Sequence, residues 1–189
     1  MKTCLITGAS GGVATALADR LRTAGWRLAL VSRDPSRVAS VPGDTVIAAD
    51  VSCEAGAEQA MEEAVAALGG VPDAVAHCAG AILVAPLGRT SEAQYRACLA
   101  ANLDSAFFVS KAYAPRVQKS DRPGALLFFS SVAAGIGVAN HAAIAMAKGG
   151  VEALVRSLAA DFSGAGLRAN AIAPGLMRTP ATERMLSNE

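Results

Sequence analysis

The sequence lacks a long hydrophobic run, an excess of charge of either sign, and any closely spaced pair of cysteines. Its 17 Lys and Arg residues oppose 16 Asp and Glu residues, so the net charge is +1. This balance provides no large basic surface of the kind that binds nucleic acid or an anionic membrane. Each apolar run meets Pro, Gly or a charge before it reaches membrane-spanning length, and the first stops at Gly8, so we expect no signal peptide. Neither nucleic acid nor a membrane is an expected partner.

The four cysteines, Cys4, Cys53, Cys78 and Cys98, are scattered along the chain. None has a partner at the C-x-x-C spacing that is typical of metal and redox sites. Cys4 and Cys78 fall in segments that we predict to be strands. Free, buried thiols in a reducing compartment are the simplest interpretation, which indicates a cytoplasmic protein. We expect neither a metal site nor a catalytic cysteine.

Apolar strands and helical segments alternate along the 189 residues, of which 52% are hydrophobic. This size and composition fit one globular domain. The pattern predicts strands near 2–7, 27–32, 44–48, 72–77, 124–130 and 167–172, and helices near 12–24, 54–69, 91–118 and 143–163. Because the strand runs are continuously apolar, we predict a parallel sheet that is covered on both faces. The fold class is therefore α/β, a single-domain, doubly wound parallel sheet with helices on both faces.

Residues 3–17 read TCLITGASGGVATAL, in which a short apolar strand meets a glycine-rich turn and then a helix-forming segment. Glycines allow backbone N–H groups to approach a phosphate, and the helix N-terminus directs its partial positive charge at the same point. The alternative interpretation is an ordinary strand-to-helix turn. The position of the turn directly after a buried-type strand favours a nucleotide phosphate site.

The spacing resembles the T-G-x-x-x-G-x-G turn of the short-chain dehydrogenase/reductase family. Thr7, Gly8 and Gly12 match this turn, and Ala14 replaces its last glycine. The resemblance implies a Rossmann-like fold and a nicotinamide dinucleotide cofactor. It places the residues of the turn against that cofactor, namely Thr7, Gly8, Ser10, Gly11, Gly12 and Val13.

The second predicted strand ends in Ser32-Arg33. In nicotinamide-binding folds an acidic residue near this point binds the ribose 2′-hydroxyl, whereas Arg accommodates a 2′-phosphate. With no carboxylate at Ser32, and Arg33 next to it, the pattern favours NADP. The alternative is a solvated loop arginine, and Asp34 could pair with Arg33 and compete for it.

Four later parts of the chain resemble further cofactor contacts of the family. Asp50-Val51 follows the third strand, although Asp50 could instead belong to a helix start with Ser52 as its cap. His77 at the end of the fourth strand is more simply a structural hydrogen-bonding group than a base. The remaining residues that the resemblance assigns to the cofactor are Ala79, Gly80, Lys148, Pro174, Gly175 and Thr179.

The resemblance also implies the catalytic residues Ser131, Lys148 and Asn102, which would polarise the substrate oxygen, hold the ribose and order a water relay. The family places a tyrosine four residues before the lysine, and that position here is Ile144. Isoleucine cannot donate a proton, so this change lowers the expected rate by roughly 10²–10⁴-fold. His141, one helical turn earlier, could supply the proton instead of capping the helix. Lys148 could also act alone if it is partly desolvated.

We therefore expect an NADP(H)-dependent oxidoreductase that acts on a small-molecule carbonyl or alcohol. The alternative is a non-redox nucleotide-binding protein or partner subunit that has lost its acid. The 143–163 helix is apolar nearly all round, which indicates a homodimer or homotetramer built through the 91–118 and 143–163 helices. Residues 1–189 would form the NADP-binding domain, without the substrate lid and last strand that the resemblance implies beyond Glu189.

Overall fold

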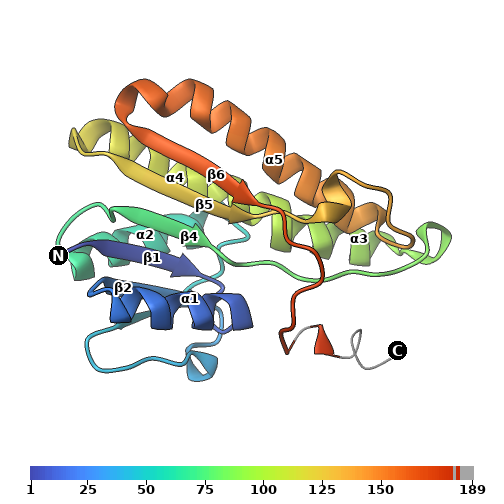
Figure 1. The fold of residues 1–189 in the computed structure, drawn as a ribbon, viewed down its shortest axis with the longest axis horizontal. Helices are drawn as coiled ribbons and strands as arrows, with labels where there is room; N and C mark the ends of the chain where they lie inside the picture. The colour runs from blue at the N-terminus through green and yellow to red at the C-terminus, as the bar shows by residue number, and fades with distance from the viewer. Residues whose placement is uncertain (181, 184–189) are drawn as a thin grey trace.

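The computed structural model describes residues 1–180, 182 and 183, which form a six-stranded parallel sheet in the order β3-β2-β1-β4-β5-β6 (Figure 1). All six predicted strands and the α/β fold class are confirmed. The strands are β1 (Thr3–Thr7), β2 (Arg27–Ser32), β3 (Thr45–Ala48), β4 (Ala74–His77), β5 (Gly124–Phe129) and β6 (Leu167–Ile172). Because all strands run in parallel, their carboxyl ends meet at one edge of the sheet, where ligands of such folds bind.

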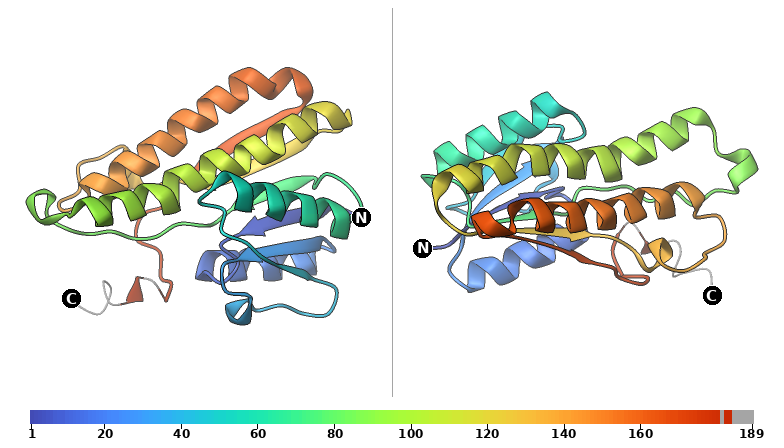
Figure 2. Two further views of the ribbon diagram at one scale, coloured as in Figure 1. Left: turned by 180° about the vertical axis from the view of Figure 1, so that it is seen from behind. Right: turned by 90° about the horizontal axis from the view of Figure 1, so that it is seen from above.

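The helices lie on both faces of this sheet, with α1 alone on one face and α2, α4 and α5 together on the other (Figures 1 and 2). Their bounds are α1 (Gly12–Thr23), α2 (Glu54–Leu68), α3 (Glu92–Leu99), α4 (Ser105–Ser120) and α5 (Ala142–Phe162). Short 3₁₀ turns η1 (Pro35–Arg37), η2 (Leu87–Arg89), η4 (Val132–Ala134) and η5 (Ser163–Ala165) lie in the connections, and η3 (Ala100–Asp104) is a π-helix.

The prediction that both faces of the whole sheet are covered was wrong for its β5–β6 half. Every residue of β1 is buried, whereas β5 alternates between buried and half-buried residues. Within the described residues, α1 is the one helix on its face, and it contacts β1 and β2. The apolar sequence of these strands correctly indicates a face that packs against α4 and α5. It does not show that a helix also covers the opposite face.

The predicted 91–118 helix is divided into α3, the π-helix η3 and α4. It begins with the expected capping box, in which the Gln94 N–H donates to Ser91 Oγ at 3.2 Å and the Ser91 N–H donates to Gln94 Oε1 at 2.9 Å. The π turn surrounds Asn102, whose side chain bonds to backbone outside and inside the helix. The Asn102 side chain competes for backbone hydrogen-bond partners, and this explains why the regular helical hydrogen bonds between residues four apart are interrupted here.

The core lies in two parts, one on each side of the sheet. The larger part is formed by one face of the sheet with α2, α4 and α5, and the smaller one by α1 with the other face of β1, β2 and β4. Tyr113 of α4 is fully buried, and its hydroxyl donates to the Pro72 carbonyl at 2.7 Å, so its polar atom is satisfied. All four cysteines are free thiols, and Cys4 and Cys98 are buried, but the expectation of buried thiols was wrong for the exposed Cys53 and the half-buried Cys78. Cys4 lies in β1 as predicted, whereas Cys78 lies just after β4.

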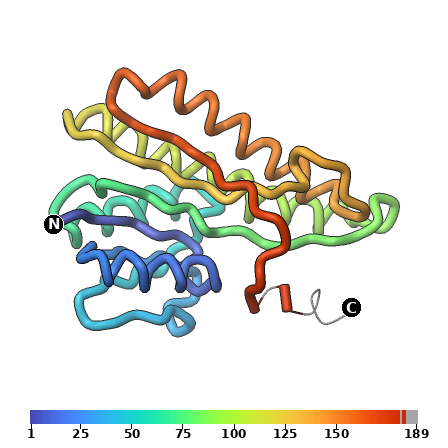
Figure 3. Tube along the Cα trace, viewed as in Figure 1, coloured from blue at the N-terminus to red at the C-terminus, as the bar shows by residue number. Residues whose placement is uncertain are grey.

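The segment after β6 crosses the carboxyl edge of the sheet and descends to the start of α1 (Figure 3). A Cβ atom on Gly12 would lie 3.1 Å from Pro180 Cδ and 3.3 Å from Thr179 Cβ. Two stretches almost the whole chain apart in sequence thus meet at the glycine turn. Within the residues that the structure describes, no helix has the length and apolar composition needed to cross a lipid bilayer.

Candidate functional site

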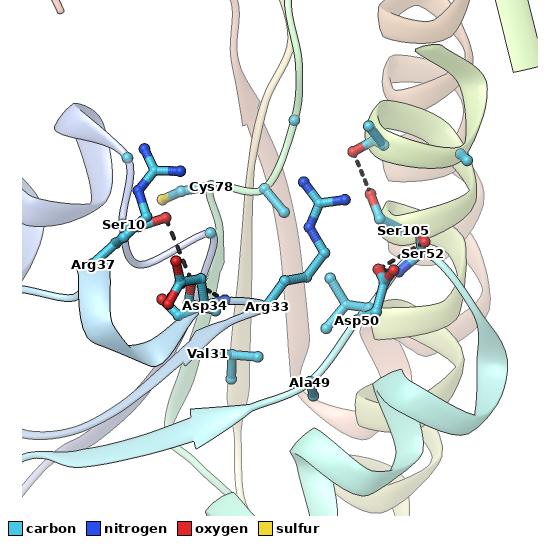
Figure 4. A pocket seen from close by; sticks show the side chains of 18 of the residues that line it. Ser10, Val31, Arg33, Asp34, Arg37, Ala49, Asp50, Ser52, Cys78 and Ser105 are labelled. Carbon is cyan, nitrogen blue, oxygen red and sulfur yellow. Dashed lines mark hydrogen bonds between the residues drawn. The ribbon is translucent and has the colours of Figure 1, made fainter. Parts of the chain in front are cut away.

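A cavity of about 350 Å³ opens at the carboxyl edge of the sheet, between the ends of β1, β2, β3 and β4 (Figure 4). Nine residues that the sequence assigns to a cofactor line it, namely Gly8, Ser10, Gly11, Ser32, Arg33, Asp50, Val51, Ala79 and Gly80. The residues come from four different loops, so the fold brings together positions that span more than seventy residues of sequence. A site of this form suits an elongated ligand that lies along the strand ends.

The glycine turn forms one wall of this cavity. Gly8 has φ +65°, and a Cβ atom there would lie 2.6 Å from the Ala79 backbone, so both the conformation and the packing require glycine. The first turn of α1 contains no acidic residue, and its N-cap Gly11 offers no side-chain cap. The free N–H groups of this helix start therefore favour an anion such as a phosphate.

Ala14, which stands where the family turn has glycine, does not line the cavity. Its methyl group is buried in the α1 side of the core, beside Ile6 and Ala18. The substitution is thus accommodated between helix and sheet. Gly12 and Val13 begin the helix without lining the cavity, and Gly12 faces Thr179 and Pro180 instead.

Arg33, which directly follows β2, and Arg37, the last residue of η1, both line the cavity. Figure 4 shows the two side chains at this corner of the cavity. The carboxylate of Asp34, between them in the sequence, accepts from the Ser36 N–H at 3.1 Å and from Ser36 Oγ at 2.6 Å. Asp34 is therefore engaged as the N-cap of η1, and no salt bridge joins it to Arg33 among the described residues.

Sequence reasoning missed Arg37. The run Asp34-Pro35-Ser36 has the composition of a helix start, with an N-cap aspartate and a proline at the first helical position. That signal predicts a turn that folds back toward the strand end, which is where η1 lies. Ser32 Oγ closes the same corner, because it donates to the Asp34 carbonyl at 3.0 Å.

Asp50 lines the cavity from the end of β3. Its carboxylate accepts from Ser52 Oγ at 2.7 Å and from the Ser52 N–H at 3.0 Å. These two hydrogen bonds, with a smaller contribution from the charge of Arg33, lower the pKa of Asp50, so it stays ionised at neutral pH. The N-cap of α2 is Cys53, so the expectation that Ser52 caps this helix was wrong.

Gly80, Asn102 and Lys148 meet at the end of β4. A Cβ atom on Gly80 would lie 2.8 Å from Asn102 Oδ1, which is too close, and 3.5 Å from Lys148 Nζ, which is an ordinary contact, so Asn102 is the residue that requires glycine here. Asn102 is buried, and its amide group donates to the Ala81 and Cys98 carbonyls, both at 2.9 Å. Its Oδ1 accepts from the Ala81 N–H at 3.3 Å. The asparagine therefore ties the π-helix to the loop that follows β4.

Lys148 extends from α5 toward the end of β5, where Nζ donates to the Phe129 carbonyl at 2.7 Å. Burial lowers the pKa of Lys148 to about 8, because desolvation disfavours the ammonium form. At neutral pH the group is still mainly protonated. The site thus contains a cation that can release its proton near physiological pH.

Ser131 follows β5 and begins η4, where its Oγ accepts from the Ala133 N–H at 3.2 Å. Among the described residues this hydroxyl donates to no acceptor, so its proton remains available. The preceding Ser130 points the other way, toward α5, and donates to Glu152 Oε1 at 2.7 Å. Of the two serines in sequence, Ser131 is the one with a free hydrogen.

Ile144 and His141 occupy the first turns of α5. Ile144 is buried and lies four residues before Lys148, so the two share one helix face. No atom of Ile144 can exchange a proton. His141 is the N-cap residue of α5, and its Nδ1 donates to the Ala139 carbonyl at 2.6 Å. Its Nε2 is left as the nitrogen that could exchange a proton with a ligand.

His77 is a structural group, as predicted. It is buried between Thr7 and Ser105, with Nδ1 at 2.8 Å from Thr7 Oγ1 and Nε2 at 3.1 Å from Ser105 Oγ. Because Ser105 Oγ donates to the Ala101 carbonyl, it accepts from His77 Nε2–H, and Nδ1 accepts from Thr7. Burial, reinforced by the charge of Lys148, lowers the pKa of His77 to about 3. The imidazole is neutral and joins β1, β4 and α4.

Several predicted cofactor residues lie outside the cavity. Thr7 directs its hydroxyl to His77 rather than to the open space. Pro174 accepts a hydrogen bond from the Val132 N–H at 3.1 Å, which joins the loops after β5 and β6. The described residues contain no group of three His, Cys, Asp or Glu side chains that could ligate a metal ion.

Comparison with known proteins gives a consistent result. The family described as enoyl-(acyl carrier protein) reductase matches residues 8–189. An uncharacterized oxidoreductase of Mycobacterium tuberculosis is 32% identical, over 100% of this chain and 72% of the relative. These matches cover the glycine turn, the Asn102 and Lys148 region, and the segment after β6.

Solved structures share the fold. An oxidoreductase of the short chain dehydrogenase/reductase family from Burkholderia thailandensis superimposes with a TM-score of 0.87 and 31% identity, over 99% of this chain and 73% of that one. A 4-hydroxyisoleucine dehydrogenase complexed with NADH reaches a TM-score of 0.92 at 22% identity, over 100% of this chain and 79% of that one. The second similarity is one of fold alone.

Proposed function

The chain belongs to the short-chain dehydrogenase/reductase family, and from this premise we propose that it is an NADP(H)-dependent oxidoreductase that interconverts a carbonyl and an alcohol. One observation carries the cofactor part of the proposal. Arg33 and Arg37 both line the cavity, while the neighbouring Asp34 is engaged by Ser36. A pair of guanidinium groups suits a 2′-phosphate, whereas a ribose 2′-hydroxyl calls for a carboxylate.

The residues that line the cavity support a place for the rest of such a cofactor. The uncapped start of α1 would receive the pyrophosphate, and Asp50 and Val51 would lie beside the adenine. Gly80 keeps the path open toward Lys148, since any side chain there would collide with Asn102. Thr179, Pro174 and Gly175 would meet the nicotinamide end.

When bound, the cofactor supplies or accepts a hydride, and the chain supplies the groups around the substrate oxygen. In our proposal the Ser131 hydroxyl donates a hydrogen bond to that oxygen. The Lys148 ammonium stabilises the negative charge that develops on it and holds the ribose. Asn102 positions the loop after β4 and orders a water beside the lysine.

Ile144 occupies the position at which the family has a proton-donating tyrosine, and isoleucine has no proton to donate. We propose that Lys148 supplies the proton, because its lowered pKa lets an ammonium group act as a general acid near neutral pH. His141 is the other candidate, because its Nε2 has no partner among the described residues and carries a proton in the imidazolium form. Without a positioned phenol the turnover number would be roughly 10²–10⁴-fold lower.

A second candidate function is supported by Ile144 itself. The chain would then be a non-redox nucleotide-binding protein or partner subunit that keeps the cavity but not the chemistry. A panel of ketones assayed with NADPH separates the two. If the wild-type protein reduces none of them and Ile144→Tyr reduces some, the non-redox alternative is favoured. If the wild-type protein reduces a ketone and His141→Ala abolishes this, the histidine is the proton donor.

The experiment that tests the main proposal is a fluorescence titration of the purified protein with NADPH and, separately, with NADH. We expect tighter binding of NADPH. Arg33→Gln should weaken NADPH binding by roughly 10–100-fold, the value of one hydrogen bond to a charged group, and should leave NADH unchanged. Arg20→Gln on the exposed side of α1 is the matched control. Equal affinity for both nucleotides would refute the NADP preference, and binding of neither would refute the cofactor.

We also propose that the chain is a cytoplasmic homodimer or homotetramer. Phe107 of α4 and Met146 of α5 are 51% and 52% exposed, which is unusual for large apolar side chains on helices that also pack against a sheet. A second copy would cover them. Light scattering of the purified protein measures the mass directly. The four free cysteines support a reducing compartment.

A further inference from the structure

Three stretches of loop at the carboxyl edge of the sheet contain no charged residue. They follow β4, β5 and β6 and comprise residues 78–88, 130–140 and 173–177, and we call them the apolar loops; Arg89 and Arg178 lie directly beyond the first and the third. In the chain as a whole 17% of residues are charged. Loops are normally the most polar part of a fold, since they face solvent. The absence of charge from all three is therefore a property of this edge and not of the composition.

The apolar loops also expose large hydrophobic side chains. Leu87 in the first loop is 76% exposed, Ile136 in the second is 62% exposed, and Leu176 in the third is 57% exposed. Ile82 and Val132 are exposed as well. Scattered single exposures need no explanation, but a gathering of them at one edge marks a binding surface.

Hydrogen bonds hold the three loops together. The Ala85 N–H donates to the Asn140 carbonyl at 2.9 Å, which joins the first loop to the second. The Val132 N–H donates to the Pro174 carbonyl at 3.1 Å, which joins the second to the third. Figure 1 shows the loops after β4 and β5 side by side beyond the end of the sheet, near α3. They form one surface rather than three separate ones.

This surface adjoins the proposed reaction centre. Ser131 lies within the second loop, and Gly80, which faces Lys148 Nζ and Asn102 Oδ1, lies within the first. A molecule whose oxygen contacts Ser131 has its substituents next to the apolar loops. Within the apolar loops themselves there is no carboxylate, ammonium or guanidinium group to bind a charged or many-hydroxyl substituent, and the guanidinium groups of Arg89 and Arg178 belong to residues just beyond their ends.

We propose that the substrate carries an alkyl or alicyclic substituent beside its carbonyl or alcohol group, and that the apolar loops bind this substituent. The inference rests on the proposed oxidoreductase function and narrows its substrate class. Polyols and substrates with a charge close to the reacting carbon are excluded as good substrates. The apolar loops would remove water from their polar groups without offering a charged group in its place.

Calorimetry with carbonyl compounds that cannot be reduced tests this without turnover. Linear alkanamides of four, six and eight carbons are titrated into the protein, with and without NADPH. Burial of a methylene tightens binding by up to about fourfold, so the dissociation constant should fall steadily along the series. Gluconamide, with the six carbons of hexanamide but five hydroxyl groups, should bind far more weakly than hexanamide.

Two variants locate the effect. Ile136→Ser and Leu87→Ser replace exposed side chains, so neither should impair folding. In each variant the dissociation constant should fall less from the four-carbon to the eight-carbon amide than it does in the wild-type protein. Val41→Ser is the matched control, because Val41 is an exposed apolar residue, at 47%, in the loop between β2 and β3. It should leave the dependence unchanged.

A dissociation constant that does not change from four to eight carbons would overturn the proposal. So would an unchanged length dependence in Ile136→Ser together with a change in the oligomeric mass of this variant in light scattering, since the loops would then bind protein. The proposed function fails in a different way, when NADPH does not bind or no ketone oxidises it. The amide series is measured regardless of that result, so the two failures are distinguishable.

Discussion

Replacement of His77 by Asn tests the interpretation of the buried imidazole. In the native protein the ring is neutral, held between Thr7 and Ser105, and burial lowers its pKa from 6.5 to about 3. An unfolded chain binds a proton at this histidine near pH 6.5, whereas the native chain does not until near pH 3. His77 therefore contributes stability that is fully present above pH 6.5 and is lost as the pH falls from 6.5 toward 3.

The size of this effect follows from the two pKa values. Each unit of pKa difference corresponds to about 1.4 kcal/mol, so the free energy of unfolding should fall by about 1.4 kcal/mol per pH unit within that window. Between pH 7.5 and pH 5 the loss from His77 amounts to about 2 kcal/mol. Other groups titrate in the same range, so the effect has to be measured as a difference between two proteins.

The assay is urea unfolding of the wild-type protein and of His77→Asn at pH 7.5, 6 and 5. Asn is polar but does not titrate, so the variant should be less stable at pH 7.5 and should lose about 2 kcal/mol less on going to pH 5. His141→Gln is the control for loss of a histidine, and it should keep the steep wild-type dependence because His77 is intact. If wild type and His77→Asn lose the same stability, the buried ring is not neutral and the reasoning fails.

Three further predictions concern the site. Gly8→Ala should lower the free energy of unfolding by more than Gly25→Ala, because both glycines have a positive φ but only Gly8 faces backbone, at 2.6 Å; urea unfolding of the pair that gives equal losses would contradict this. Asn102→Leu should destabilise by about 1–3 kcal/mol or more for each buried backbone group that loses its partner, measured in the same way; an unchanged midpoint would show that these groups find other partners. Ketone reduction should slow as the pH rises through about 8, where Lys148 loses its proton, and a rate that is constant to pH 9.5 would exclude the lysine as the acid.

The sheet and most helix boundaries were predictable because their signals are local. Strand runs of five or six apolar residues are bounded by glycine or charge, and the Ser91 capping box marks a helix start within three residues. The π-helix was not predictable, since it depends on Asn102 reaching Ala81, twenty-one residues away. The prediction that helices cover both faces of β5 was wrong because an apolar strand sequence does not reveal which face of the strand is packed.

The residues of the candidate site were predictable where a short motif determines the backbone conformation. They were less predictable where the position of a side chain depends on packing or on how a later turn folds. Gly8 and Arg33 directly follow a strand and Asp50 comes two residues after one, so all three lie at the strand ends and line the cavity. Thr7 also ends a strand, but its side chain alternates to the inside, where His77 takes its hydroxyl. Arg37 was missed because its position depends on how η1 folds back, which a sequence pattern only suggests.

The π-helix has a consequence for how this chain can change over evolution. Its extra residue lets Asn102 reach the loop after β4 while the helix beyond still turns Val109, Tyr113 and Val117 into the core. Deleting one residue within Ala100–Asp104 would rotate α4 by about 100° relative to α3, so that either the asparagine or this buried row would face the wrong way. The length of this segment is therefore constrained as strongly as the identity of Asn102 within it.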